Sequence, residues 1–191
     1  MEEERIKSAF EIAMERISAL PELTAEEIAA QKEKQYRPVG EAIAVRYLNG
    51  LISVEEVASE LDKYRDEQKR IVERALISSL CSALLIEGNP ESAARALCGI
   101  SRIRPENRAL VEKTAKEFQS IRKEFGREKR EKSKKFGAAV MERMRELGIS
   151  GSAMRPNLNE NPDWQQELAQ IRQKYESRVT ALRISLQQEL P

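Results

Sequence analysis

The feature that most constrains the fold of this chain is the spacing of its apolar residues, which recur at steps of three and four along most of its length. One face of an α-helix has this spacing, whereas the period of two that is typical of a β-strand appears nowhere in the sequence. The most regular run has the pattern of a coiled-coil seam. Its members are Trp164, Leu168, Ile171, Tyr175, Val179, Leu182, Leu186 and Leu190. The sequence therefore predicts an all-α protein.

Prolines and glycines divide the N-terminal part of the chain into separate helices. Residues 6–20 form one amphipathic stripe, and Pro21 should end that helix. A second helix is expected to stop near Gln35, because Pro38 should interrupt it. A third helix then leads to Gly50, which is suited to a left-handed helix terminus.

Two capping boxes mark helix starts in this part of the chain. Thr24 is followed three residues later by Glu27, and Ser53 by Glu56. From Ser53 the apolar stripe continues to about Glu87, which predicts one long helix. Its second half is apolar on most sides and is expected to be the best-buried segment of the protein.

The C-terminal part of the sequence predicts two long helices, one over residues 105–147 and one that begins after the loop 148–162. Each helix has a single narrow apolar stripe, so each needs a partner helix. The simplest arrangement is an antiparallel hairpin, and the alternative pairs the last helix with its copy in another subunit. We therefore expect a helical bundle over residues 1–104, followed by a coiled-coil-like hairpin arm over residues 105–191.

The composition argues against an enzyme. Of the 191 residues, 40% are hydrophobic, 34% are charged and 5% are aromatic, which is typical of elongated helical proteins. The chain contains no histidine, the commonest general base and metal ligand. Cys81 and Cys98 form no CxxC pair and lie on apolar faces, which predicts buried, inert thiols rather than a disulfide or zinc site. We expect no catalytic residues, no cofactor and no metal.

The chain shows no sign of a membrane or export segment. Its acidic start lacks the apolar core of a signal peptide. The longest mostly apolar stretch, residues 75–86, is too short to span a bilayer. Together with the two unpaired cysteines, these observations predict a cytoplasmic protein without a membrane partner.

Charge is unevenly distributed, although the net charge is only +1. Residues 1–104 carry a net charge of −4 and residues 105–191 carry +5. This asymmetry either orients an acidic partner or a second copy of the chain, or it reflects chance variation. The densest basic segment lies between Gly126 and Gly137. These two glycines indicate either a kink, a hinge or the close approach of another backbone, or simple tolerance of glycine on a solvated face. The basic residues of this segment are Arg127, Lys129, Arg130, Lys132, Lys134 and Lys135. They are either phosphate contacts for RNA or a ribosomal surface, or solvated side chains whose stems cover the helix seam.

Two functions follow as hypotheses. The leading one is a non-enzymatic interaction or assembly module that binds a protein partner or itself. Its expected contact stripe, used within the arm or between subunits, consists of Leu168, Ile171, Tyr175, Leu182 and Leu186. The alternative is an RNA- or ribosome-associated factor that uses the basic segment.

Two stretches carry resemblances to known proteins. Residues 77–105 resemble one tetratricopeptide-type helical hairpin at Leu80, Leu84, Ala93, Leu97, Ile100 and Pro105. That likeness implies a scaffold that binds partner peptides in a groove. The opening IKSAFEIAMER and the loop GISGSAMRPN resemble small bacterial all-helical proteins of an uncharacterised family. This second resemblance implies a helical fold and a bacterial cytosol, but no activity.

Overall fold

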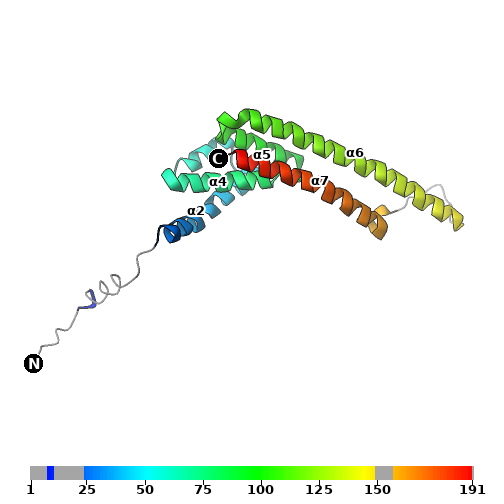
Figure 1. The fold of residues 1–191 in the computed structure, drawn as a ribbon, viewed down its shortest axis with the longest axis horizontal. Coiled ribbons are helices and arrows are strands. Elements are labelled where there is room, and N and C mark those ends of the chain that lie inside the picture. The colour runs from blue at the N-terminus through cyan, green and yellow to red at the C-terminus, as the bar shows by residue number, and fades with distance from the viewer. Residues whose placement is uncertain (1–7, 11–23, 149–156, 191) are drawn as a thin grey trace, which may run out of the picture.

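The protein is all-α, as the spacing of its apolar residues predicts. The computed structural model describes residues 8–10, 24–148 and 157–190, and contains no strand within them. The helix expected over residues 6–20 lies outside the described residues, except for its part in 8–10. In chain order the helices are α2 (Ala25–Leu48), α3 (Val54–Leu61), α4 (Asp66–Ser82), α5 (Pro90–Ile103), the short η1 (Pro105–Asn107), α6 (Arg108–Glu146), the short η2 (Leu158–Glu160) and α7 (Pro162–Glu189) (Figure 1).

The expected interruption at Pro38 is wrong, because α2 runs through this residue. Pro38 is exposed, so water can solvate the carbonyl group that loses its hydrogen bond. Contacts on both sides of the proline keep the helix on α4. Before it, Tyr36 is half-buried against the core, and after it Gly40 and Ile43 are buried. Tertiary packing thus outweighs the local preference of the proline.

The single helix expected from Ser53 to about Glu87 is also wrong. The chain ends α3 at Leu61, turns, and begins α4 at Asp66, which has a φ of 48°. Aspartate is one of the few residues other than glycine that adopts this left-handed conformation readily. The capping boxes at Thr24 and Ser53 are both present, which confirms these two helix starts.

The core is centred on α4, where the sequence places the best-buried segment. Leu76, Leu80 and Leu84 have no exposed surface. Helix α2 crosses α4 closely at Gly40, where a side chain would overlap the α4 backbone. Leu85, which the sequence includes in this segment, is 44% exposed because α4 ends at Ser82.

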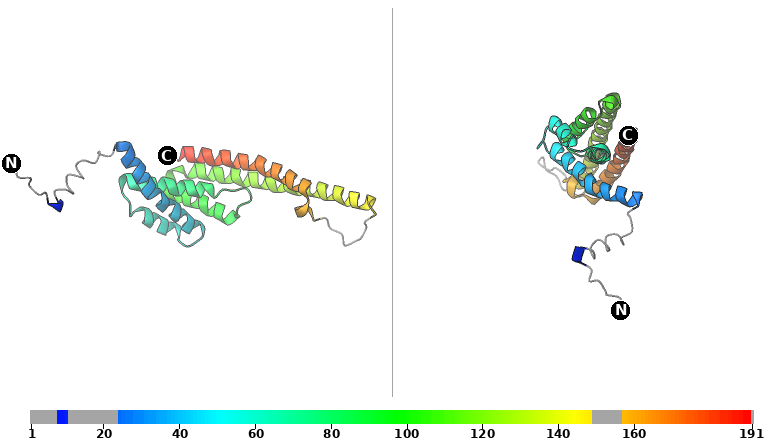
Figure 2. Two further views of the ribbon diagram at one scale, coloured as in Figure 1. Left: turned by 90° about the horizontal axis from the view of Figure 1, so that it is seen from below. Right: turned by 90° about the vertical axis from the view of Figure 1, so that its left-hand side faces the viewer.

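Helices α6 and α7 form the antiparallel hairpin (Figures 1 and 2). Helix α6 has 39 residues, a length of about 58 Å. It continues without a break past Gly126 and Gly137, so neither glycine interrupts the helix. One cluster of buried side chains extends from α2 through α4 and α5 to α6 and α7, and therefore crosses the expected boundary between residues 104 and 105.

Candidate nucleic-acid interface

The apolar stripe of α7 faces α6 in the same chain. Leu168, Ile171, Tyr175 and Leu186 are buried, and Leu182 is half-buried. Aromatic rings pack between the two helices beside them. One example is the edge-to-face pair of Phe125 and Tyr175, whose ring centroids lie 5.7 Å apart. The five residues expected to bind a partner or a second subunit thus pack within the chain, and among them only Leu182 is more than marginally exposed.

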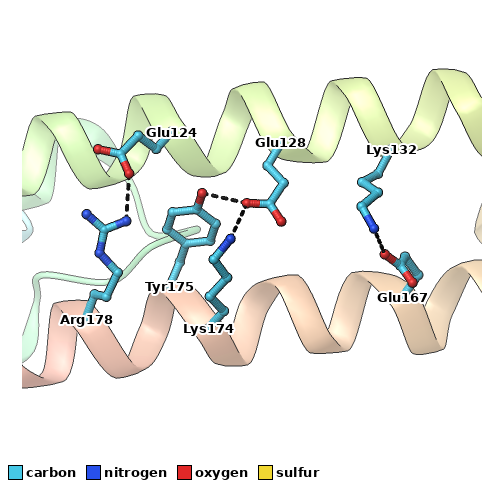
Figure 3. Close-up of polar contacts among 7 residues, drawn as sticks. All are labelled: Glu124, Glu128, Lys132, Glu167, Lys174, Tyr175 and Arg178. Atoms are coloured by element: carbon cyan, nitrogen blue, oxygen red, sulfur yellow. Dashed lines mark hydrogen bonds and ion pairs between the residues drawn. The ribbon is translucent and has the colours of Figure 1, made fainter.

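Beside this seam, ion pairs join α6 to α7 (Figure 3). The Glu124 carboxylate accepts a hydrogen bond from Arg178 at 2.7 Å. Further along, the Glu128 carboxylate accepts hydrogen bonds from Lys174 at 2.6 Å and from the Tyr175 hydroxyl at 2.7 Å. Single pairs of this exposed kind contribute little free energy. Their consequence is that two glutamates in the middle of α6 are turned toward α7 and paired.

These hydrogen bonds also set the protonation of both glutamates. The hydrogen bond from Arg178 is the main cause that lowers the pKa of Glu124, and the one from Lys174 is the main cause that lowers the pKa of Glu128. Both carboxylates therefore remain charged, and both stay engaged with α7 rather than with the outer side of α6.

The hairpin divides the six basic residues that the sequence singles out. Lys129 pairs with Glu87 at 2.7 Å and lies over the Phe125 ring, while Lys132 pairs with Glu167 (Figure 3 shows the second pair). These two lysines follow Phe125 by four and seven residues, so they share its face toward α7. The other four are exposed, and none of them forms an ion pair within the described ranges: Arg127, Arg130, Lys134 and Lys135.

The exposed basic side chains belong to a longer row on the outer side of α6, which we call the basic ridge. It consists of Lys116, Lys123, Arg127, Arg130 and Lys134. The steps of seven, four, three and four residues keep all five on the side opposite the seam. All five are exposed and none forms an ion pair with another described residue. From Lys116 to Lys134 the ridge is about 27 Å long.

Sequence reasoning missed Lys116 and Lys123 because they lie outside the charge-dense segment 126–135. The signal that could have found them is the heptad-like spacing that they share with Arg127 and Lys134. Only the hairpin contacts, however, show which side of α6 faces solvent, and hence which cations remain unpaired.

The ridge is suited to a chain of phosphates. Guanidinium and ammonium groups bind phosphate oxygens, and each contact releases condensed counterions. The acidic residues between Lys116 and Lys134 are two paired glutamates, Glu124 and Glu128, and two at the flanks of the ridge, Glu117 and Glu131. No aromatic side chain lies in the row, so the chemistry favours contact with the phosphate backbone over base stacking.

Other site types find less support in the described residues. Among residues 8–10, 24–148 and 157–190, no group of three or more Cys, Asp or Glu side chains is arranged to hold a metal ion. No helix in these ranges combines the length and apolarity needed to cross a membrane. The Cys81 thiol is buried, and burial raises its pKa to about 12. Cys98 is exposed, so the expectation that both thiols are buried is wrong for this residue.

Fold and site together define an all-α protein with a basic helical-hairpin arm. No protein-family model, curated protein or solved structure matches the chain.

Proposed function

We propose that this protein is a non-enzymatic docking module whose hairpin arm binds the phosphate backbone of RNA through the basic ridge. The observation that supports the proposal is the row of five exposed cations without ionic partners, on a side of α6 that faces away from α7. Unpaired cations in a line retain their full charge for an external anion, whereas Lys129 and Lys132 are already neutralised within the chain.

Assembly through the α7 stripe has weaker support, since its residues are enclosed between α7 and α6. A second subunit would reach them only if the hairpin opened, and opening would expose the apolar seam to water. The absence of histidine from the sequence supports binding over catalysis.

The test is RNA binding by the full chain, measured by fluorescence anisotropy with mixed-sequence RNA over a range of salt concentrations. The ridge variant carries Arg127→Glu, Arg130→Glu and Lys134→Glu. Its matched control reverses three exposed cations of the bundle that also form no ion pair in the described chain, by Lys34→Glu, Arg65→Glu and Arg70→Glu. Both variants change the net charge by the same amount.

We expect the ridge variant to raise the Kd at least about tenfold and to reduce the salt slope by about two, the value for three lost contacts to single-stranded RNA. The control variant should bind within about twofold of the wild type at moderate salt. Equal losses in both variants would mean that net charge alone drives binding. Undiminished binding by the ridge variant would remove the proposal.

A further inference from the structure

Helix α2 lies on the outside of the bundle and has an exposed side opposite its contacts with α4 (Figures 1 and 2). Its inner side buries Gly40, Ile43 and Tyr47. On its outer side, uncharged residues recur at steps of three, four, three, four and three, and all of them are exposed. We call this row the α2 stripe: Ile28, Gln31, Gln35, Pro38, Ala42 and Val45.

The α2 stripe differs from an ordinary solvated helix face. Such a face normally carries charged residues, and 34% of the residues in this chain are charged. The α2 stripe instead exposes two large aliphatic side chains, Ile28 at 41% and Val45 at 56%, with Pro38 and Ala42 between them. A face about 26 Å long without a charge favours contact with another protein surface.

The stripe complements itself when two copies of α2 pack antiparallel about a two-fold axis. With the axis between residues 36 and 37, the numbers of the two residues in each facing pair add up to 73. The facing pairs are then Ile28 with Val45, Gln31 with Ala42, and Gln35 with Pro38. The two aliphatic side chains thus cover each other at both ends of the contact.

The charges along the edge of the stripe match in the same register. Lys34 of one copy comes beside Glu41 of the other, and the two-fold axis forms this pair twice. Lys34 is exposed and forms no ion pair with another described residue. Glu41 pairs with Arg37 at 2.9 Å through Oε1 alone, which leaves Oε2 for a second cation. No like charges meet, because the other charged edge residues come beside uncharged ones: Glu27 beside Leu48, Lys32 beside Val39, and Arg46 beside Ala25.

Pro38 provides a third match. Proline has no N–H, so the carbonyl oxygen of Lys34, four residues earlier, lacks its usual helical donor. In the antiparallel register the side-chain amide of Gln35 of the second copy lies beside Pro38 and can donate a hydrogen bond to this oxygen. The contact therefore offers a new partner to the one backbone group of this face that the proline leaves without its donor.

From these three matches we infer that the α2 stripe binds the α2 stripe of a second copy of this chain in antiparallel orientation. One helix from each chain should bury less than the about 1,600 Å² of a stable interface, so the dimer is weak and dissociates on dilution. The basic ridge belongs to α6, so a substitution in α2 changes the dimer without removing a contact to RNA.

Sedimentation equilibrium of the full chain over a range of concentrations measures the Kd of the dimer. Lys34→Glu and Glu41→Lys should each raise this Kd about tenfold, because each turns two attractive pairs into two repulsive ones. The double variant Lys34→Glu/Glu41→Lys exchanges the charges and should restore the Kd to within about threefold of the wild type. Arg70→Glu is the matched control, because it makes the same change of charge at an exposed residue of α4 and should leave the Kd within about twofold.

A chain that stays monomeric up to about 1 mM would overturn the inference. So would a dimer that Val45→Lys or the single charge variants leave unchanged, because another surface would then hold it together. Single charge variants that weaken the dimer without recovery in the double variant would refute the antiparallel register, and with it the proposed contact.

Discussion

The crossing of α2 over α4 provides the sharpest test of how this protein is packed. A Cβ atom added at Gly40 would lie 2.2 Å from the carbonyl oxygen of Val72, 2.8 Å from the Cβ of Ala75 and 2.9 Å from the backbone nitrogen of Leu76. Two of these three atoms belong to the α4 backbone, so no change of rotamer relieves the overlap. Since carbon–oxygen contacts normally begin at about 3.3 Å, Gly40→Ala should force the helices about 1 Å apart.

The expected change in the free energy of unfolding is the sum of two opposing effects. Overpacking of a core costs about 3 kcal/mol where the backbone cannot yield. Alanine recovers about 1 kcal/mol because it is a better helix former than glycine. Gly40→Ala should therefore lower the free energy of unfolding by about 2 kcal/mol, which for a domain of this size lowers Tm by about 4–8 °C.

The assay is urea and thermal unfolding followed by circular dichroism, with Gly126→Ala as the matched control. A Cβ atom at Gly126 would approach only the flexible Arg130 side chain, at 3.6 Å. This control should thus raise the free energy of unfolding by up to about 1 kcal/mol. If Gly40→Ala proves as stable as the wild type, the close crossing of α2 and α4 is wrong.

Two further predictions concern the hairpin and the thiols. Hydrogen bonds from basic side chains of α7 lower the pKa values of Glu124 and Glu128 below 4.5, so their contribution to stability is complete above pH 4.5 and is lost as the pH falls through the lowered values. Tm should therefore fall on acidification below about pH 4.5, and it should fall less steeply in the double variant Glu124→Gln/Glu128→Gln. An equal dependence of Tm on pH in both proteins would refute the assignment of this loss of stability to the two glutamates. In the folded protein a thiol reagent should modify Cys98 and spare Cys81, whose pKa burial raises to about 12, whereas denaturant should expose both. Labelling of Cys81 under folding conditions, assigned by peptide mapping, would contradict its burial.

Local sequence signals predicted the helix starts that carry a side-chain cap. The hydroxyl of Thr24 accepts from the Glu27 N–H, and that of Ser53 accepts from the Glu56 N–H, because these contacts involve only residues three apart. The cap at Asn161, before α7, depends on neighbours in the same way. The seam from Trp164 to Leu190 was also readable, since a narrow apolar stripe requires a partner helix whatever the rest of the fold.

Tertiary contacts decided the features that local signals missed. Pro38 lies inside α2 because residues before and after it pack against the core. The turn before Asp66 follows no glycine or proline signal, and it folds the stripes of α3 and α4 onto one core. In the basic segment, periodicity places Lys129 and Arg130 on adjacent positions, but only the approach of Glu87 shows that Lys129 is neutralised.

The sequence by itself thus determined the helical class, the capped helix starts and the need of each apolar stripe for a partner, because these depend on residues three or four apart. The tertiary structure alone decided which partner each stripe meets, where a helix ends or continues, and which cations stay unpaired. Those outcomes depend on contacts between residues distant in the chain, such as Gly40 with Val72 and Lys132 with Glu167. No local sequence pattern encodes the energies of such contacts.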